Sequence, residues 1–168
     1  MPTKKRKVFE KGHLRKFLIV VDDSPEFDVA LAFAARVADR TGGGLSLAYV
    51  IQPADFHHWL GVEEVRREEE MGKAKALFRL ARRRLARVGC EDIPLEEIVR
   101  EGDKAEEILA LIEEDEDIAI LVLGAAANSE GPGPLVSSLA AGSGAGTFPI
   151  PIYVVPGSLE VDDILALA

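Results

Sequence analysis

The residues best suited to chemistry lie in segment 122–138, where an apolar run leads through a glycine-rich loop into the start of a helix. Backbone NH groups at the start of a helix favour anions, and glycine lets a ligand approach the backbone closely. Loops of this kind bind phosphate groups in α/β proteins. The candidate donors are the backbone NH groups of Gly131, Gly133, Leu135, Val136 and Ser137.

The composition of this loop opposes a polyphosphate ligand. Pro132 and Pro134 have no NH group to donate, and Glu130 adds a negative charge. Segment 105–168 contains no Lys or Arg. A triphosphate needs several NH donors or cations, so the sequence predicts weak or absent ATP binding. It favours a ligand with fewer phosphates, such as AMP or adenosine.

A second candidate group is acidic and follows the apolar run 17–21. Asp22, Asp23 and Ser24 stand between this run and Pro25. Ser24 can cap a helix, and proline fits its first position. Two roles remain open for Asp22: it contacts a ligand, or it shapes the turn from strand to helix.

The elements that must position these residues alternate along the chain. Strands are predicted at 17–21, 45–51, 95–100, 118–123 and 150–155, and helices at 25–40, 62–88 and 103–115, with a short one from Pro134. This order predicts a single α/β domain in which a doubly wound parallel sheet carries helices on both faces. The ligand crevice of such a sheet lies beyond the carboxyl ends of its strands, where the strand order reverses. If the first and fourth strands are neighbours there, Asp22 faces the Gly124 loop.

Composition and charge narrow the classes of partner. The 168 residues carry a net charge of -9, but residues 1–16 hold seven basic residues against one acidic residue. The acidic remainder argues against a nucleic-acid partner, although the tract 4–8 resembles a nuclear import signal or a nucleic-acid arm as well as a solvated tail. No apolar run approaches the roughly 20 residues that span a membrane, and the single Cys90 permits no internal disulfide. We therefore expect a cytoplasmic protein without a membrane partner.

Four motifs in order resemble the universal stress protein family. The first strand ends in Val-Asp-x-Ser at 21–24, and the second ends in Tyr-Val-Ile at 49–51. The fourth strand reads Ile-Leu-Val-Leu-Gly at 120–124, and the chain closes with Pro-Ile-Tyr-Val-Val-Pro at 151–156. The resemblance covers residues 17–156, and it is the order and spacing of the four motifs that make it specific.

The resemblance implies a fold and a mode of assembly. The fold is a five-stranded parallel sheet of order 3-2-1-4-5, as in adenine nucleotide alpha hydrolase-like proteins, in a domain spanning 17–157. The expected flanks are a basic flexible tail at 1–16 and an amphipathic tail at 158–168. A homodimer through the fifth strand, Ile150 to Val155, is also implied. In that dimer, the apolar residues of the C-terminal tail would dock on the neighbouring subunit.

The resemblance also implies binding residues for an adenine nucleotide. The family's adenine contacts correspond to Asp22 and Val50. Its ATP motif, Gly-x2-Gly-x9-Gly-(Ser/Thr), falls on Gly124, Ala127, Ser137 and Ser138, so the two middle glycines are replaced. The resemblance thus predicts a stress-response module that binds a small ligand without catalysis. The alternatives are a member that binds or slowly hydrolyses ATP, and a dimeric interaction protein without a ligand.

Other chemistries find little support in the residues. A receiver domain would need an Asp after the third strand and a Lys after the fifth, where this chain has Glu101 and no Lys. An adenylating enzyme would need cations at the phosphates. His57 and His58 lack the spaced partners of a zinc site, and the two serines lack a nearby base. The sequence therefore predicts no metal ligands and no catalytic residues.

Overall fold

The computed structural model of the chain describes residues 5–53, 60–128, 131–141 and 144–168. Along the chain lie β1 (Lys16–Val20), α1 (Pro25–Arg40), β2 (Gly44–Ile51), α2 (Leu60–Arg87), β3 (Leu95–Glu101), α3 (Lys104–Glu114), β4 (Ile118–Ala125), the short helices η1 (Val136–Ala140) and η2 (Ala145–Thr147), β5 (Ile152–Pro156) and α4 (Val161–Leu167). The strands form one parallel sheet of order β3-β2-β1-β4-β5. This order confirms the predicted fold.

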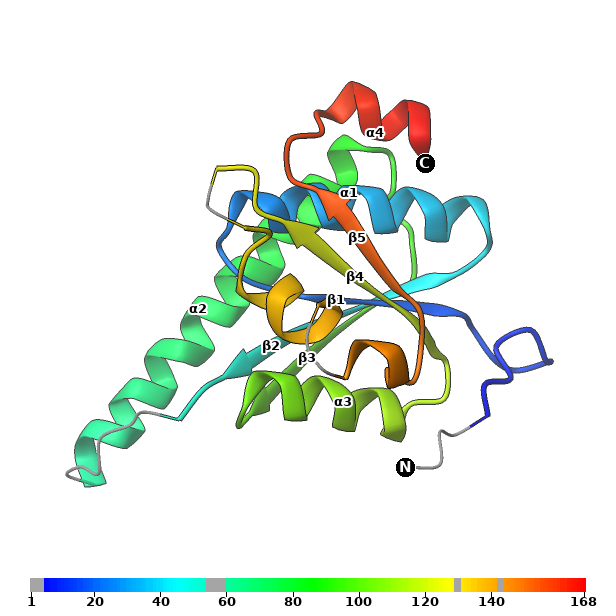
Figure 1. The fold of residues 1–168 in the computed structure, drawn as a ribbon. Helices are drawn as coiled ribbons and strands as arrows, with labels where there is room; N and C mark the ends of the chain where they lie inside the picture. Colours follow the sequence, from blue (N-terminus) through cyan, green and yellow to red (C-terminus); the bar gives the residue numbers. More distant parts are fainter. Residues whose placement is uncertain (1–4, 54–59, 129–130, 142–143) are drawn as a thin grey trace.

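Helices cover both faces of the sheet (Figure 1). One face packs against α1 and the C-terminal part of α2, with α4 lying outside α1, whereas α3 and η1 cover the other face. The N-terminal half of α2 extends beyond the edge of the sheet. The arrangement therefore has three layers, with β1 at the centre of the middle layer.

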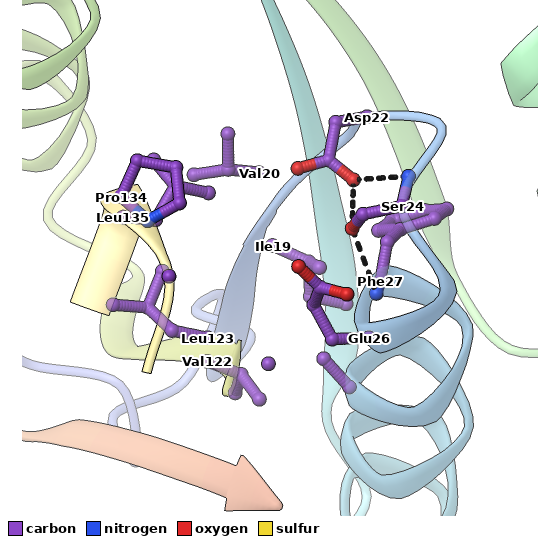
Figure 2. A pocket seen from close by; sticks show the side chains of 13 residues that line it. Ile19, Val20, Asp22, Ser24, Glu26, Phe27, Val122, Leu123, Pro134 and Leu135 are labelled. Carbon is purple, nitrogen blue, oxygen red and sulfur yellow. Dashed lines mark hydrogen bonds between the residues drawn. The ribbon is translucent and has the colours of Figure 1, made fainter. Parts of the chain in front are cut away.

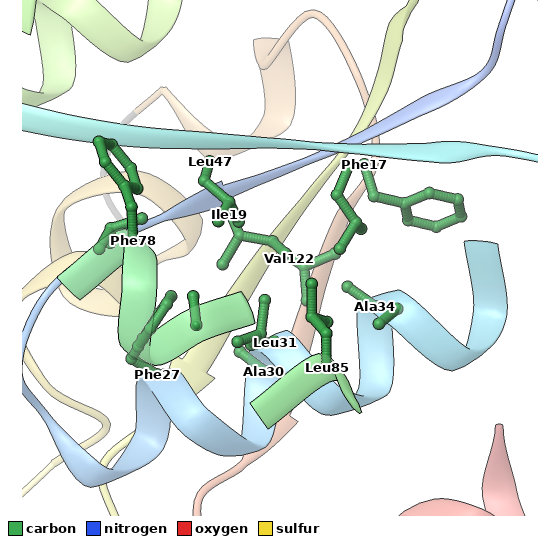
Figure 3. Close-up of a cluster of buried hydrophobic side chains, with 14 of the residues drawn as sticks. Phe17, Ile19, Phe27, Ala30, Leu31, Ala34, Leu47, Phe78, Leu85 and Val122 are labelled. Atoms are coloured by element: carbon green, nitrogen blue, oxygen red, sulfur yellow. The ribbon is translucent and has the colours of Figure 1, made fainter. Parts of the chain in front are cut away.

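Alternating residues of β1 explain why its sequence is apolar throughout. Phe17 and Ile19 point into the core cluster under α1 and α2, and Leu18 and Val20 point into the cluster under α3 and η1. Figure 3 shows the first cluster, in which Ile19 and Val122 meet Leu31 of α1 and Leu85 of α2. A strand buried on both faces has no polar side. β1 is such a strand, and it carries the site at its carboxyl end.

Several element boundaries differ from those predicted. β1 begins at Lys16, which the sequence analysis placed in the N-terminal tail, and β5 runs from Ile152 rather than from Ile150. Pro149 and Pro151 have no NH group for the sheet ladder, which delays the start of β5. Ile150 precedes the strand and is buried in the cluster under α3. The turn after Pro134 leads into a single π-helical turn, η1.

The C-terminal segment folds onto its own chain. Ile164 of α4 is buried, and Leu159 packs against the cluster under α1. Leu165 and Leu167 stay exposed. The expectation that the whole apolar stripe docks on a neighbouring subunit is therefore wrong for Leu159 and Ile164, because α1 of the same chain already covers them.

Candidate functional site

The strand order reverses at β1, which places a crevice at the carboxyl ends of the central strands. β1 pairs with β2 on one side and with β4 on the other. Asp22 follows β1, Val50 lies in β2 and Gly124 lies in β4. The predicted neighbour relation between the first and fourth strands is confirmed, and it brings Asp22 to the side of the Gly124 loop. Three adjoining hollows open at this point.

Asp22 and Ser24 form the turn that starts α1. The backbone NH of Ser24 donates to Oδ1 of Asp22 at 2.9 Å, and the Ser24 hydroxyl donates to the same oxygen. Ser24 in turn accepts a hydrogen bond from the backbone NH of Phe27 at 3.3 Å, as an N-cap residue does. Asp22 can therefore shape the turn with Oδ1 and still contact a ligand with Oδ2, which makes no hydrogen bond within the described part of the chain.

The smallest hollow lies between β1, β4 and the start of η1 (Figure 2). Asp22, Ser24, Gly124 and Gly133 line it together with apolar side chains. Its volume is about 30 Å³, enough for one or two water molecules. This space is too small for an adenine ring.

Glu26 is a residue of this site that the sequence analysis missed. It stands in the first turn of α1, and Figure 2 shows its carboxylate directed into the same space as that of Asp22. It also lines the adjoining hollow of about 360 Å³ over the loop, with Ala127, Asn128 and Gly133. Acidic residues are common in the first turn of a helix, where the dipole favours them, so its type alone gave no signal.

Two backbone NH groups in and beside the glycine-rich loop donate to carbonyl groups of the loop itself. The backbone NH of Ala126 donates to the carbonyl of Pro132 at 2.9 Å, and that of Ser137 donates to the carbonyl of Gly133 at 3.0 Å. The prediction of a free NH group at Ser137 is therefore wrong. Gly131 and Gly133 have φ angles of 91° and 95°, which let the loop fold back on itself.

The remaining loop residues face away from the small hollow. Ser137 and Ser138 are exposed, and the Ser138 hydroxyl donates to the carbonyl of Leu135 at 3.3 Å. Ala127 is also exposed and lines only the outer hollow. Gly131, Ser137 and Ser138 line none of the three hollows. Glu130 lies outside the described residues.

The third hollow lies on the opposite side of Asp22 and is polar. Asp22, Asp23 and Val50 line it, as do three basic residues of the helices, Arg66, Lys73 and Lys104. Its volume is about 260 Å³. Three carboxylates, Asp22, Asp23 and Glu70, line the same hollow, so its charges balance.

Tyr49 and Glu70 form the wall of the polar hollow. The Tyr49 hydroxyl donates to Oε2 of Glu70 at 2.6 Å. Burial, together with this carboxylate, raises the pKa of Tyr49 well above its usual value. The phenol therefore remains a donor to one oxygen of the Glu70 carboxylate.

Cys90 lines none of the three hollows. Cys90 is buried, and burial raises the pKa of its thiol. His57 and His58 lie outside the described residues. Within the part of the chain that the structure describes, no group of three His, Cys, Asp or Glu side chains could hold a metal ion, and no helix is long and apolar enough to cross a membrane.

Comparisons with known proteins agree with this architecture. The model of the universal stress protein family matches residues 13–156. A search of the curated proteins finds no match. The solved structure of a universal stress protein from Lactobacillus plantarum is 20% identical, with a TM-score of 0.67, over 84% of this chain and 97% of that one.

Two further solved structures contain a ligand. A universal stress protein in complex with cAMP is 19% identical, with a TM-score of 0.61, over 86% of this chain and 98% of that one. One from Archaeoglobus fulgidus in complex with dAMP is 18% identical, with a TM-score of 0.53, over 84% and 97%. At these identities the likeness shows the shared fold.

Proposed function

Because the chain belongs to the universal stress protein family, we propose that it is a stress-response regulatory protein that binds an adenine nucleoside or monophosphate without turning it over. The observation that carries this proposal is the position of Asp22 at the switch point of the sheet, between the hollow lined by Val50 and the glycine-rich loop near Glu26. The free Oδ2 of Asp22 can accept a hydrogen bond from the amino group of adenine. Glu26 opposes further phosphates in the two hollows near the loop, and no Lys or Arg stands among the described residues that line them.

The ligands of the similar proteins support a small number of phosphates. The complexes with cAMP and dAMP each hold a nucleotide with a single phosphate. Cleavage of a triphosphate would need positive charge at the transferred group. Segment 105–168, which contains the loop, has no Lys or Arg. These features favour binding over catalysis.

Titration calorimetry with adenosine, AMP and ATP tests the proposal. Adenosine and AMP are expected to bind more tightly than ATP. The variant Asp22→Asn keeps an oxygen for Ser24 but replaces the free acceptor by a donor, so it should lose adenosine binding. The matched control is Asp92→Asn, which removes an exposed carboxylate outside the three hollows. Tighter binding of ATP than of AMP, or multiple turnovers of ATP with Mg²⁺, would contradict the proposal.

Replacement of Glu26 tests the origin of the discrimination against ATP. The variant Glu26→Gln removes one negative charge that faces the loop, so ATP affinity should rise by about three- to fivefold, the effect of up to about 1 kcal/mol from a partly solvated charge. Adenosine affinity should not change. An equal rise for both ligands would mean that Glu26 blocks the way into the site and does not act by repelling phosphate charge.

The small size of the inner hollow favours a second candidate function. A hollow of about 30 Å³ is too small for an adenine ring, and a dimeric interaction protein needs no ligand cavity. A thermal shift screen separates the two: stabilisation by adenosine supports the binding module, and an unchanged melting temperature with every adenylate supports the interaction protein.

A further inference from the structure

We propose that one face of α2 binds the same face of a second copy of this chain, with the two helices antiparallel. This outer face is the exposed side of α2 that carries Glu64, Glu68, Gly72, Lys75, Arg79 and Arg83. The inference concerns assembly and does not depend on nucleotide binding. The surface is distinct from that of β5, because none of the described residues that line the hollow beside Val154 belongs to α2.

Charge is divided between the two halves of α2. Residues 60–70 hold five Glu and two Arg, whereas residues 71–87 hold seven basic residues and no acidic one. The helix dipole favours such charges only in the first and last turns, so it does not account for Glu68 or Lys75. Two parallel copies of α2 would place like charges together, whereas antiparallel copies place each acidic half along a basic half.

The charged residues of the outer face have no partners of their own. Three other arginines of α2 pair with carboxylates of the same chain: Arg67 with Glu101, Arg82 with Glu97, and Arg84 with Asp28. The five charged residues of the outer face form no ion pair within the described part of the chain. Arg79 donates only to the carbonyl of Lys75 in its own helix, at 3.5 Å. These five charges can therefore pair with another molecule.

Like charges are also neighbours along this side of the helix. Four basic residues follow one another at intervals of four: Lys75, Arg79, Arg83 and Arg87. Glu64 and Glu68 have the same spacing. Side chains four residues apart lie next to each other on a helix, so like charges at this spacing destabilise it. Opposite charges brought by a second helix would offset this repulsion.

Gly72 lies near the middle of α2, where two antiparallel copies would cross. It is exposed, and nothing lies within 4 Å of its Cβ position. Glycine inside a helix lowers its stability relative to alanine, and no close neighbour in the described chain requires one here. A second backbone approaching at this point would. A two-fold axis beside Gly72 sets Glu64 opposite Arg83 and Glu68 opposite Arg79, and each pair then occurs twice.

Val65 adds an apolar group to the outer face. It is 55% exposed, and it lies about two helical turns before Gly72 on the same side. In the antiparallel pair it would contact the aliphatic stems of the facing arginines. Leu80, in contrast, points to the flank of this face, about 80° around the helix from Gly72.

Charge reversal followed by mixing tests the pairing. All variants are made in a parent protein that carries Val154→Lys, so that association through the edge of β5 does not contribute. The basic variant is Glu64→Lys with Glu68→Lys, and the acidic variant is Arg79→Glu with Arg83→Glu. Each alone should associate at least about tenfold more weakly than the parent in sedimentation velocity, because four charge contacts become repulsive. An equimolar mixture should recover the association of the parent, because every contact is then again between opposite charges.

The matched control is Glu10→Lys with Glu106→Lys, which reverses two exposed glutamates away from α2 and should associate like the parent. Raising the salt from about 0.1 M to about 1 M shortens the Debye length from about 10 Å to about 3 Å, so it should weaken the association of the parent. Circular dichroism shows whether each variant keeps its helices. If the acidic variant unfolds, Arg79→Glu alone mixed with Glu68→Lys alone gives the same test. A parent that stays monomeric at every concentration, or a mixture that recovers no association, would overturn the pairing.

Discussion

Gly124 allows the end of β4 to touch the first turn of α1. A Cβ atom at this position would lie 2.2 Å from the carbonyl oxygen of Glu26. Gly157 is similar, since its Cβ would lie 2.4 Å from the carbonyl oxygen of Ala125. At both positions the glycine permits backbone to pack on backbone, and this contact also carries Glu26 into the site.

Substitution of Gly124 by alanine should therefore be destabilising. The new methyl group must push α1 and β4 apart, which costs about 1–3 kcal/mol in a well-packed region. Urea denaturation monitored by circular dichroism gives the free energy of unfolding. Gly146→Ala is the control, because nothing lies within 4 Å of its Cβ position. A loss of stability no greater than that of the control would show that the contact is not tight.

The sequence located part of the site at this scale. Asp22 and Ser24 could be predicted because an acidic turn, a cap and a proline follow an apolar strand directly. Glu26 could not, since its approach to the loop depends on the close contact between its backbone and Gly124. The hydrogen bonds that Ala126 and Ser137 make within the loop could not be predicted from the sequence either, because they depend on how the loop folds back on itself.

At the scale of elements, the alternation of apolar runs and amphipathic segments was sufficient to predict the five strands and the three longer helices. The observed boundaries differ from the predicted ones where the backbone lacks an NH group, as at the prolines before β5. The position of α4 was not predictable, because an apolar stripe does not reveal which surface covers it. Ile164 is covered by its own chain.

Acidic residues just before β4, Asp115 and Asp117, bind basic side chains at the start of the described chain. Nδ1 of His13 lies 2.7 Å from Oδ1 of Asp117, and Lys16 lies 2.8 Å from Oδ2 of Asp115. Arg6 donates to the carbonyl of Asp115 at 2.7 Å. This basic segment therefore attaches to the domain through charge complementarity.

The attachment should depend on pH. The hydrogen bond with Asp117 raises the pKa of His13 above 6.5, with further contributions from Glu116 and Glu10. A raised pKa in the folded state stabilises the protein fully below the unfolded value, and the stabilisation is lost as the pH rises through the folded value. His13→Gln should therefore lower the free energy of unfolding at about pH 5.5 and have little effect at about pH 9. Denaturation at both pH values measures this, and an equal effect at both would refute it.

At the scale of the whole molecule, β5 and α4 leave an apolar surface uncovered. Tyr153, Val154 and Leu167 are 39%, 44% and 65% exposed, and they line a shallow hollow of about 500 Å³ with Phe33. Tyr153 also contacts the rings of Phe17 and Phe33 edge-on. β5 is an edge strand, so this surface is where the homodimer implied by the family resemblance would form.

A lysine at position 154 should weaken such a dimer. Val154→Lys places a charge at the centre of the surface, and its burial without a partner opposes association. Sedimentation velocity over a range of concentrations should show at least a tenfold rise in the dissociation constant. Leu80→Lys, on an exposed position of α2, is the control. A wild-type protein that is monomeric at all concentrations would contradict the proposed dimer.

The central position of β1 also decides when its two edges are covered during synthesis. β1 is made before the other four strands of the sheet, but its second neighbour, β4, begins only at Ile118. Until then one edge of β1 and the apolar side chains of Leu18 and Val20 have no cover, and open edges of this kind invite pairing with other chains. The edge of β1 therefore stays open to pairing with other chains until β4 has been made and inserts beside it.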